Sequence, residues 1–336
     1  MIRGIPRVRG RGLRAIIHLT AVLLTSASLA FLCLHLAPGD AGTALGEGLS
    51  PAARDALRVR YGLDQPLAVQ YVKWLSALLQ GDLGWSTSQH RPVLEVIGAA
   101  FGRTLWIVIP AFVLSLLGGM WIGTWQGLRT GSLGDRLFTW ITLALHATPD
   151  VALASAVLLV GAGGLSLFPT GGMTSDVYRY LPKASQWLDR LQHLVLPVFT
   201  IALVGAATVA RHQRASLRAA VQLPFMALLP SRGLPPSRIR WHAWRNALAP
   251  VLSVAGVLLP AWLAGLVFVE QVFAWPGMGY LLVQAIAAQD MALVSGAVLL
   301  ASAAALTMAR LAAAARAMAD PRLADPPLAA DNPRTR

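Results

Sequence analysis

The side chains that usually perform catalysis or hold metal ions are few and scattered in this chain of 336 residues. A phosphate-binding P-loop ends in Gly-Lys-Ser or Gly-Lys-Thr, but the two lysines, Lys73 and Lys183, follow Val72 and Pro182. The seven histidines form no His-Glu-x-x-His pattern, and Cys33 is the single cysteine. Zinc sites and intrachain disulfides need such groupings. We therefore expect no enzyme activity and no catalytic, cofactor-binding or metal-binding residue.

One pair of titratable residues has a spacing of interest. His146 and Asp150 are four residues apart inside an apolar stretch, which predicts that they share one face of a helix. A membrane-embedded aspartate costs about 2.5 to 3.5 kcal/mol on insertion scales and therefore faces a bundle interior or a wet cavity. The alternative is a His–Asp pair that satisfies itself and fixes helix packing.

The elements that must position this pair are apolar segments. The chain is 56% hydrophobic and 13% charged, whereas soluble domains are about 25% charged. A membrane-spanning helix needs about 20 apolar residues, and six intervals between charged residues are long enough. Buried helices of a large soluble core are the alternative, but they require polar surface that this chain lacks. The intervals are Ala15–Gly39, Thr104–Leu128, Leu137–Gly161 with Asp150 inside, Leu191–Ala210, Asn246–Val269 and Met291–Ala309.

Four of the intervals contain an internal proline. In a membrane helix, neighbouring helices or water satisfy the carbonyls that a proline leaves free. These prolines therefore predict kinks rather than helix ends. They are Pro110, Pro149, Pro197 and Pro260.

The arginines predict the orientation of the spans. From Leu191 to Val269 the chain has no Asp or Glu, yet seven arginines lie in its middle. Such a basic loop between apolar runs is typical of the cytoplasmic side. Nineteen of the 28 Lys and Arg residues then share that side with both termini. Six of the other nine lie in one long segment, and the preference of positive charge for the cytoplasmic side is weak in long loops. Because the arginines alternate with spans, nucleic-acid binding is not predicted.

Short motifs in a fixed order carry a resemblance to a known family. From about Leu13 to Leu323 the chain is similar to the first membrane subunit of dipeptide, oligopeptide and nickel importers of the binding-protein-dependent ABC class. The motifs are Leu36-Ala37-Pro38-Gly39-Asp40 with Tyr61–Pro66 and Gly81–Gly84; Arg103-Thr104-Leu105; His193–Pro197 with Ala210–Leu217; and His242–Leu248 with Val269–Gly279, ending in Asp320-Pro321-Arg322.

The resemblance implies an all-α integral protein of the inner membrane, with six transmembrane helices in a type I ABC importer permease-like bundle. Both termini would lie in the cytoplasm. It also implies partners: a second homologous permease subunit, two cytoplasmic ABC ATPase subunits that bind ATP, and an extracytoplasmic solute-binding protein. No cofactor is implied for this chain itself, because the ATP is bound by the partner subunits.

In such importers the loop between spans four and five carries a short helix that docks on an ATPase. By this resemblance, Gly233 matches the family's glycine, while the alanine position falls on Leu229 and is followed by Pro230. The stretch from Gly233 to His242 is one residue shorter than the family's spacing. A bulkier side chain and a proline both alter how a short helix seats in a groove. A turn that needs positive φ is the alternative reason for Gly233. The coupling role is assigned to Phe225, Leu229, Arg232, Gly233 and Ile239.

Two further sites follow as hypotheses. His146 and Asp150 are expected to line the translocation path and to favour cationic groups, such as a peptide amino terminus or a metal complex. Glu270 with the turn Trp275-Pro276-Gly277, at the outer end of span five, suits an outer gate or the place where a substrate-delivering protein docks. An aromatic anchor at the membrane interface is the alternative reason for Trp275.

The predicted layout follows the chain in order. A cytoplasmic basic tail (1–14) precedes the first transmembrane helix (15–36) and an extracytoplasmic segment (37–103) with short helices, one over Leu67–Gln80 that stops at Gly81. The permease core (104–320) contains five transmembrane helices and the ATPase-coupling loop (212–245), and a disordered cytoplasmic tail (321–336) follows. The five helices are at about 104–128, 137–161, 191–211, 246–269 and 291–310.

Local signals also predict the shape of the coupling loop. Four prolines between residues 224 and 236 leave no room for a helix longer than about two or three turns. We expect the fourth span to extend as a helix to Val221, followed by a short helix around Phe225–Leu229, a turn at Gly233 and a helix from Ser237 onward.

The predicted function is that of a permease subunit that moves a small solute, foremost di- or oligopeptides, into the cytoplasm with ATP hydrolysed by partner subunits. Within the same class the alternatives are import of nickel or a metal chelate, or of glutathione. From other classes the alternatives are a stand-alone secondary transporter and a membrane anchor without transport function. Asp150 is the single carboxylate at clear membrane depth, which is little provision for ion coupling.

Overall fold

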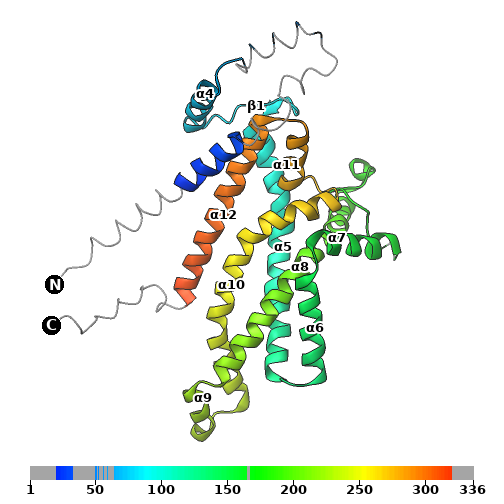
Figure 1. Ribbon diagram of the computed structural model, residues 1–336. Coiled ribbons are helices and arrows are strands. Elements are labelled where there is room, and N and C mark those ends of the chain that lie inside the picture. The colour runs from blue at the N-terminus through cyan, green and yellow to red at the C-terminus, as the bar shows by residue number, and fades with distance from the viewer. Residues whose placement is uncertain are drawn as a thin grey trace, which may run out of the picture. The chain divides into compact units, whose positions relative to one another are not determined.

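The computed structural model describes residues 20–32, 50, 52, 56, 59, 64–164 and 167–319. This part of the chain is mostly helical, with one short β-hairpin (Figure 1). It divides into two compact units, Met1–Leu105 with Pro276–Leu306, and Trp106–Trp275 with Thr307–Arg336. The predicted tails 1–14 and 321–336 lie outside the described residues, and the first predicted span is described only as the helix Thr20–Leu32.

The first unit is built around the beginnings of two long helices. Its elements are the helix Thr20–Leu32, α4 (Leu67–Leu79), the antiparallel strands β1 (Trp85–Ser86) and β2 (Arg91–Pro92), the start of α5 (Val93–Leu128), α11 (Met278–Ala287) and the start of α12 (Met291–Ala319). Val93 and Ile97 of α5 pack with Leu293 of α12 in its core. The predicted helix over Leu67–Gln80 is confirmed, because α4 ends at Leu79 and Gly81 takes φ +82°.

One buried carboxylate joins the hairpin of this unit to α12. Asp290 precedes α12 and is fully buried. Its Oδ1 accepts a hydrogen bond from the Leu293 amide (3.0 Å) and thereby caps the helix. Its Oδ2 accepts from the Ser86 hydroxyl (2.6 Å) and from the amide and hydroxyl of Ser88 (2.9 and 2.8 Å). A buried carboxylate is stable only when its oxygens are satisfied in this way.

The second unit contains the remaining helices. They are the rest of α5, α6 (Leu133–Ala147), α7 (Asp150–Leu158) with the π-helix η1 (Leu159–Gly164), the 3-10 turn η2 (Tyr178–Tyr180), α8 (Lys183–Val221), α9 (Pro224–Leu228), the 3-10 turn η3 (Pro230–Arg232), and α10 (Pro236–Val272). In Figure 1, α8 and α10 lie side by side, and contacts between them are extensive. A cluster around Ile107, Leu196, Leu266, Phe273 and Trp275 forms its main core.

Glycines bring α5 and α8 into close contact. Gly119, Gly123 and Gly127 recur every four residues and therefore share one face of α5. A Cβ atom on Gly123 would lie 2.4 Å from the Ala210 carbonyl oxygen of α8, closer than real Cβ atoms approach. Small residues at such spacing allow membrane helices to pack backbone to backbone.

Among the described residues, three helices are long and apolar enough to cross a membrane: Val93–Leu128, Lys183–Val221 and Met291–Ala314. The pair formed by Leu133–Ala147 and Asp150–Gly164 adds a fourth if the two are one broken span. The fifth predicted interval, Asn246–Val269, lies within α10. α5, α6, α8 and α10 begin before the predicted spans, and α12 ends after its span, because a charged residue marks where apolar sequence stops rather than where a helix ends.

The third predicted span is not one helix, and this expectation was wrong. The chain breaks between Ala147 and Asp150, and the two pieces are bent by 108°. Thr148 is extended (φ −80°, ψ 128°), because the ring of Pro149 disfavours helical geometry in the residue before it. Pro110 and Pro197, by contrast, lie inside the continuous helices α5 and α8.

Candidate functional site

The loop between α8 and α10 has the predicted layout. α8 continues without a break to Val221, a short helix follows in α9, and Gly233 forms the turn before α10. α10 begins at Pro236, with proline in its first turn, where a missing N–H removes no helical hydrogen bond. The predicted helix end at Val221, the short helix and the turn at Gly233 are therefore confirmed.

Two of the predicted coupling residues hold the loop from inside. Leu229 and Ile239 pack against a buried cluster of Leu217, Met226, Ala243 and Ala247. This cluster joins α8, α9 and α10, so the loop is seated on the ends of both long helices. The large Leu229 side chain is therefore partly buried in this interior contact.

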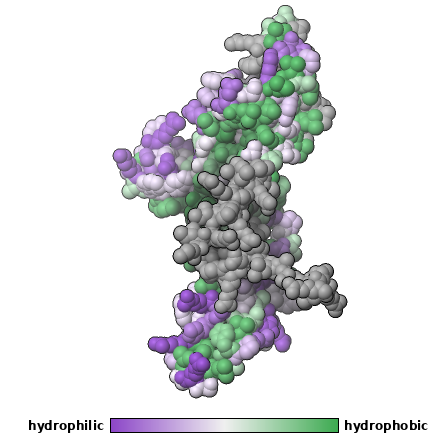
Figure 2. Space-filling model, turned by 90° about the vertical axis from the view of Figure 1, so that its left-hand side faces the viewer, coloured by the Kyte–Doolittle hydropathy of each residue, from purple (hydrophilic) through white to green (hydrophobic). Residues whose placement is uncertain are grey.

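Other residues of the loop face outward. Phe225 is 41% exposed and Leu228 is 57% exposed. They are three residues apart and so share a face of α9, opposite the buried Met226. Arg232 and Gly233 are exposed as well. Figure 2 shows hydrophobic side chains among hydrophilic ones at the end of the molecule that carries α9. Sequence reasoning named Phe225 but missed Leu228, which the helical spacing would have indicated.

Gly233 has a backbone reason to be glycine. Its φ is +73° and its ψ is 16°, the left-handed conformation that caps η3, which residues with a Cβ adopt at a cost. Among the described residues no atom lies within 4 Å of a Cβ added there. The geometry therefore agrees with the alternative explanation, that Gly233 is required by the turn.

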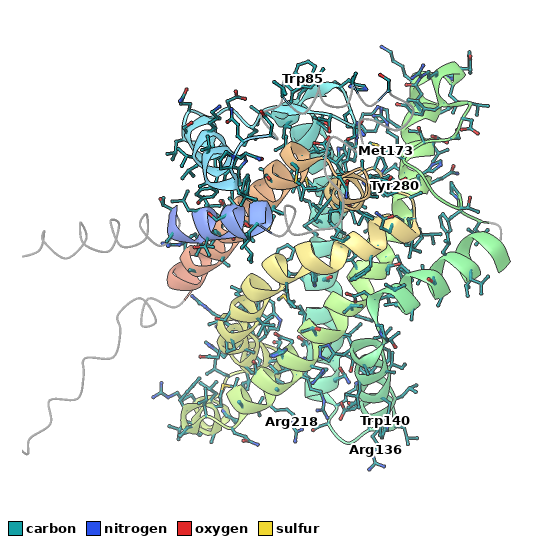
Figure 3. All side chains as sticks on the ribbon, turned by 45° about the horizontal axis from the view of Figure 1, so that its top comes forward. Trp85, Arg136, Trp140, Met173, Arg218 and Tyr280 are labelled. Carbon is teal, nitrogen blue, oxygen red and sulfur yellow. The ribbon has the colours of Figure 1, made fainter. Side chains whose placement is uncertain are left out.

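The α9 end of the second unit is basic. Arg136 of α6 and Arg218 of α8 both lie at this end with their side chains directed outward (Figure 3). Arg214, one turn before Arg218, instead pairs with the buried Asp135 of α6. Two of the segments that the charge count assigned to one side of the membrane, the turn before α6 and the loop after α8, thus lie at one end of this unit.

His146 and Asp150 do not share a helix face, and that expectation was wrong. His146 is exposed in the last turn of α6, whereas Asp150 is half-buried in the first turn of α7, beyond the 108° bend. The self-satisfied pair is equally unsupported, since no hydrogen bond or ion pair joins the two side chains in the described part of the chain.

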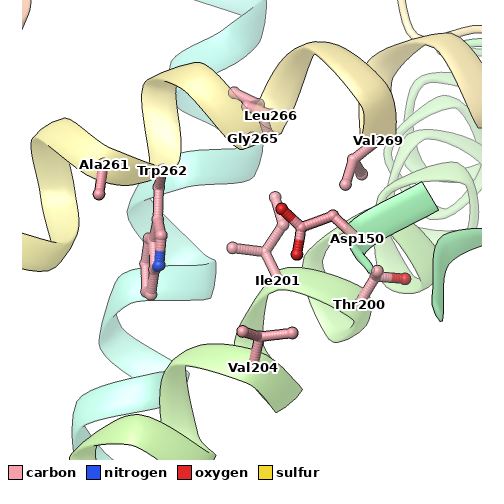
Figure 4. Close-up of a pocket in the computed structure, with 9 residues that line it drawn as sticks. All are labelled: Asp150, Thr200, Ile201, Val204, Ala261, Trp262, Gly265, Leu266 and Val269. Atoms are coloured by element: carbon pink, nitrogen blue, oxygen red, sulfur yellow. The ribbon is translucent and has the colours of Figure 1, made fainter. Parts of the chain in front are cut away.

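Asp150 lines a pocket whose other walls the sequence analysis did not name (Figure 4). The pocket has a volume of about 200 Å³ and lies between α7, α8 and α10. Its walls come from Thr200, Ile201 and Val204 of α8 and from Ala261, Trp262, Gly265, Leu266 and Val269 of α10. Asp150 is the one charged residue among these nine described lining residues. The bend at Pro149 brings it to the two helices that the coupling loop connects.

The predicted outer-gate residues form a tight turn. Glu270 and Trp275 are buried, and the Trp275 amide donates a hydrogen bond to the Glu270 carbonyl oxygen (2.8 Å). An interfacial anchor would need an exposed indole, so the buried Trp275 does not fit that alternative. In the other unit, the Pro276 carbonyl accepts a hydrogen bond from Arg103 (3.2 Å), and Gly277 precedes α11.

Comparisons with known proteins agree with this architecture. Residues 115–325 match the family described as binding-protein-dependent transport system inner membrane component, and residues 11–107 match its amino-terminal region. The chain is 32% identical to the oligopeptide transport system permease protein AppB of Bacillus subtilis, over 80% of this chain and 84% of that protein.

Other relatives are similarly close. The chain is 31% identical to a putative peptide permease protein of Brucella ovis, over 84% of this chain and 88% of the relative. It is 32% identical to the glutathione transport system permease protein GsiC of Salmonella paratyphi A, over 86% and 90% of the two chains. A transport component of this kind is not an enzyme. The chain belongs to the family of inner-membrane components of binding-protein-dependent transport systems.

Proposed function

We propose that this chain is one of two membrane subunits of an ABC importer that brings small peptides into the cytoplasm. Relatives named as oligopeptide and peptide permeases support peptides as the substrate. The observation that carries the proposal is the connection of α8 to α10 by one loop with an outward apolar face, Phe225 and Leu228, together with the pocket that the same two helices line.

The proposed mechanism follows from this connection. α8 is continuous from Thr200, in the pocket, to Val221, at the loop, a length of about 30 Å at 1.5 Å per residue. Movement of the loop by closing ATPase subunits would shift α8 and α10 as stiff rods, as in other transitions that use rigid helices and interfaces. The pocket between them would then change shape, although no ATP binds to this chain.

The rest of the proposal concerns topology and partners. The chain crosses the inner membrane six times with both termini in the cytoplasm, and the path lies between it and a second, homologous permease subunit. Two cytoplasmic ATPases dock on the coupling loop, and an extracytoplasmic binding protein delivers the solute. Glu270, Trp275, Pro276 and Gly277 form the outer gate or the docking place of that protein, since a tight buried turn of this kind suits a discrete two-state element.

A tagged form of the chain tests the proposal. An ATPase should co-purify with it, and a deletion strain should lose uptake of di- and oligopeptides that the intact gene restores. Glutathione is the second candidate, favoured by the relative GsiC, and it is measured in parallel with nickel. Peptide uptake that persists in the deletion strain, while glutathione uptake is lost, would move the assignment to glutathione. Uptake without any associated ATPase would favour a stand-alone secondary transporter.

A further inference from the structure

We propose that the Asp150 pocket is a subsite for the ammonium group of the passing solute, so that the permease itself reads the amino terminus of a peptide. This inference rests on the proposed function, because it assumes that peptides pass this point. At about 200 Å³, the pocket is smaller than the roughly 300 to 1,000 Å³ of sites that bury a whole drug-sized ligand. It suits one end group rather than a complete peptide.

The carboxylate of Asp150 is available to a ligand. It is half-buried, and in the part of the chain that the structure describes no hydrogen bond or ion pair reaches it. Its oxygens point into the space between α8 and α10 (Figure 4). A carboxylate in such surroundings is costly unless something compensates its charge, and a bound cation would supply that compensation.

Gly265 makes room for this carboxylate on α10. A Cβ atom at position 265 would lie 2.7 Å from Asp150 Oδ2, too close for any other residue without a shift. The absence of a side chain at this one place therefore lets the carboxylate enter the space between the two long helices.

The other walls favour a cation over an anion or a neutral group. The Trp262 indole forms one wall (Figure 4), and an aromatic face attracts ammonium groups within about 6 Å. The Thr200 hydroxyl donates its hydrogen bond to the Leu196 carbonyl oxygen (2.9 Å), so its donor is not offered to a ligand. Aliphatic side chains line the rest, and poor solvation strengthens the attraction between carboxylate and ammonium.

A purely structural role for Asp150 is the competing explanation. An acidic residue in the first turn of a helix interacts favourably with the helix dipole, and Asp150 is the first residue of α7. That role predicts a loss of stability when the charge is removed. It predicts neither charge-selective access to the pocket nor protection of the pocket by peptides.

Cysteine labelling separates the two roles. Val204 lines the pocket and is half-buried, so Val204→Cys is placed in a Cys33→Ser background of the complete importer in membrane vesicles. Its reaction rates are measured with cationic, neutral and anionic methanethiosulfonates of similar size. The cationic reagent should react about tenfold faster than the anionic one, as a nearby carboxylate in a poorly solvated pocket requires. Asp150→Asn should abolish that preference, and Asp176→Asn, which removes an exposed carboxylate, should leave it.

Protection by peptides completes the test. A dipeptide with a free amino terminus should slow labelling at position 204, its N-acetylated form should not, and Asp150→Asn should remove the difference. Equal rates for cationic and anionic reagents, or equal protection by both peptides, would overturn the subsite. The neutral reagent reports whether Asp150→Asn preserves the pocket. If the proposed function is wrong, no ATPase will co-purify with the chain. The ratio of cationic to anionic labelling rates does not depend on that result, so the two failures can be told apart.

Discussion

Arg214 of α8 forms a bidentate salt bridge with Asp135 of α6: Nε donates to Oδ1 at 2.7 Å and Nη2 donates to Oδ2 at 2.8 Å. Asp135 is buried, and its Oδ2 also accepts from the Gly131 amide (3.0 Å). Two parallel charge-assisted bonds fix orientation as well as distance. α8 is thus tied to α6 seven residues before the end of α8 at Val221, close to the point where the coupling loop begins.

Removing this salt bridge should weaken the packing of the carboxy-terminal end of α8 against α6. Arg214→Ala leaves Asp135 buried with one strong partner fewer, and we expect a loss of about 1.5 to 3 kcal/mol in stability. Arg214→Lys should recover only part, because an ammonium group cannot form the two-armed contact. Thermal unfolding of the purified complex measures both variants. Arg218→Ala, at an exposed position on the same helix, is the control, and an equal loss in that variant would contradict the prediction.

The glycine contact between α5 and α8 gives a second prediction. Gly123→Ala should push the two helices apart, because its Cβ would meet the Ala210 carbonyl oxygen at 2.4 Å. Gly118→Ala, on the same helix, meets its nearest neighbour at 4.0 Å and should be neutral or slightly stabilising, since alanine favours helix over glycine by about 0.5 to 1 kcal/mol. The yield of folded protein in membranes distinguishes them. Equal yields would show that the close approach is not needed.

Gly233 and Gly131 separate docking from backbone strain. Both are exposed and take positive φ, +73° and +83°, with open space for a Cβ among the described residues. Gly233→Val and Gly131→Val therefore introduce similar strain, but only Gly233 lies on the coupling loop. We expect Gly233→Val to reach the membrane yet lose solute-stimulated ATP hydrolysis, while Gly131→Val keeps it. Similar hydrolysis in the two variants would mean that Gly233 serves only as a turn.

The Asp290 network should set the stability of the first unit. Asp290→Ala removes the partner of three donors from Ser86 and Ser88 and the cap of α12. We expect a loss of about 2 kcal/mol or more in the free energy of unfolding, because buried donors are then left unsatisfied. Asp82→Ala removes an exposed carboxylate that accepts one hydrogen bond, from the Gly84 amide, in the part of the chain that the structure describes, and should cost less. Protease sensitivity of the 82–92 segment compares the two, and equal sensitivity would contradict the network's importance.

Much of the fold could be predicted from local signals. The prolines and Gly233 interrupt helical structure in the coupling loop, and they were sufficient to predict the end of α8 at Val221 and the turn before α10. The break at Pro149 carried a signal too. Thr148-Pro149-Asp150 combines a residue held extended by the following proline with an acid at a helix start, a pattern that favours two helices over one kinked helix.

The pocket and the buried networks could not be predicted in the same way. Asp150 meets Gly265, and Ser86 meets Asp290, across more than 100 residues of sequence, and hydrophobic periodicity does not say which helices become neighbours. The same limit applies to Leu229 and Ile239. Sequence spacing placed them on the coupling loop, but only the packing around Met226 decides that they face inward.

The central claim is that the loop between α8 and α10 lies in the cytoplasm against an ATPase. Its most direct test uses two cysteines, each in a Cys33→Ser background: Leu228→Cys on the exposed face of α9 and Lys183→Cys at the start of α8, the far end of the same helix from the loop. Leu228→Cys should cross-link to the ATPase subunit and resist a membrane-impermeant thiol reagent added outside intact cells, whereas Lys183→Cys should react with it. Labelling of Leu228→Cys from outside would contradict the topology and, with it, the proposed coupling.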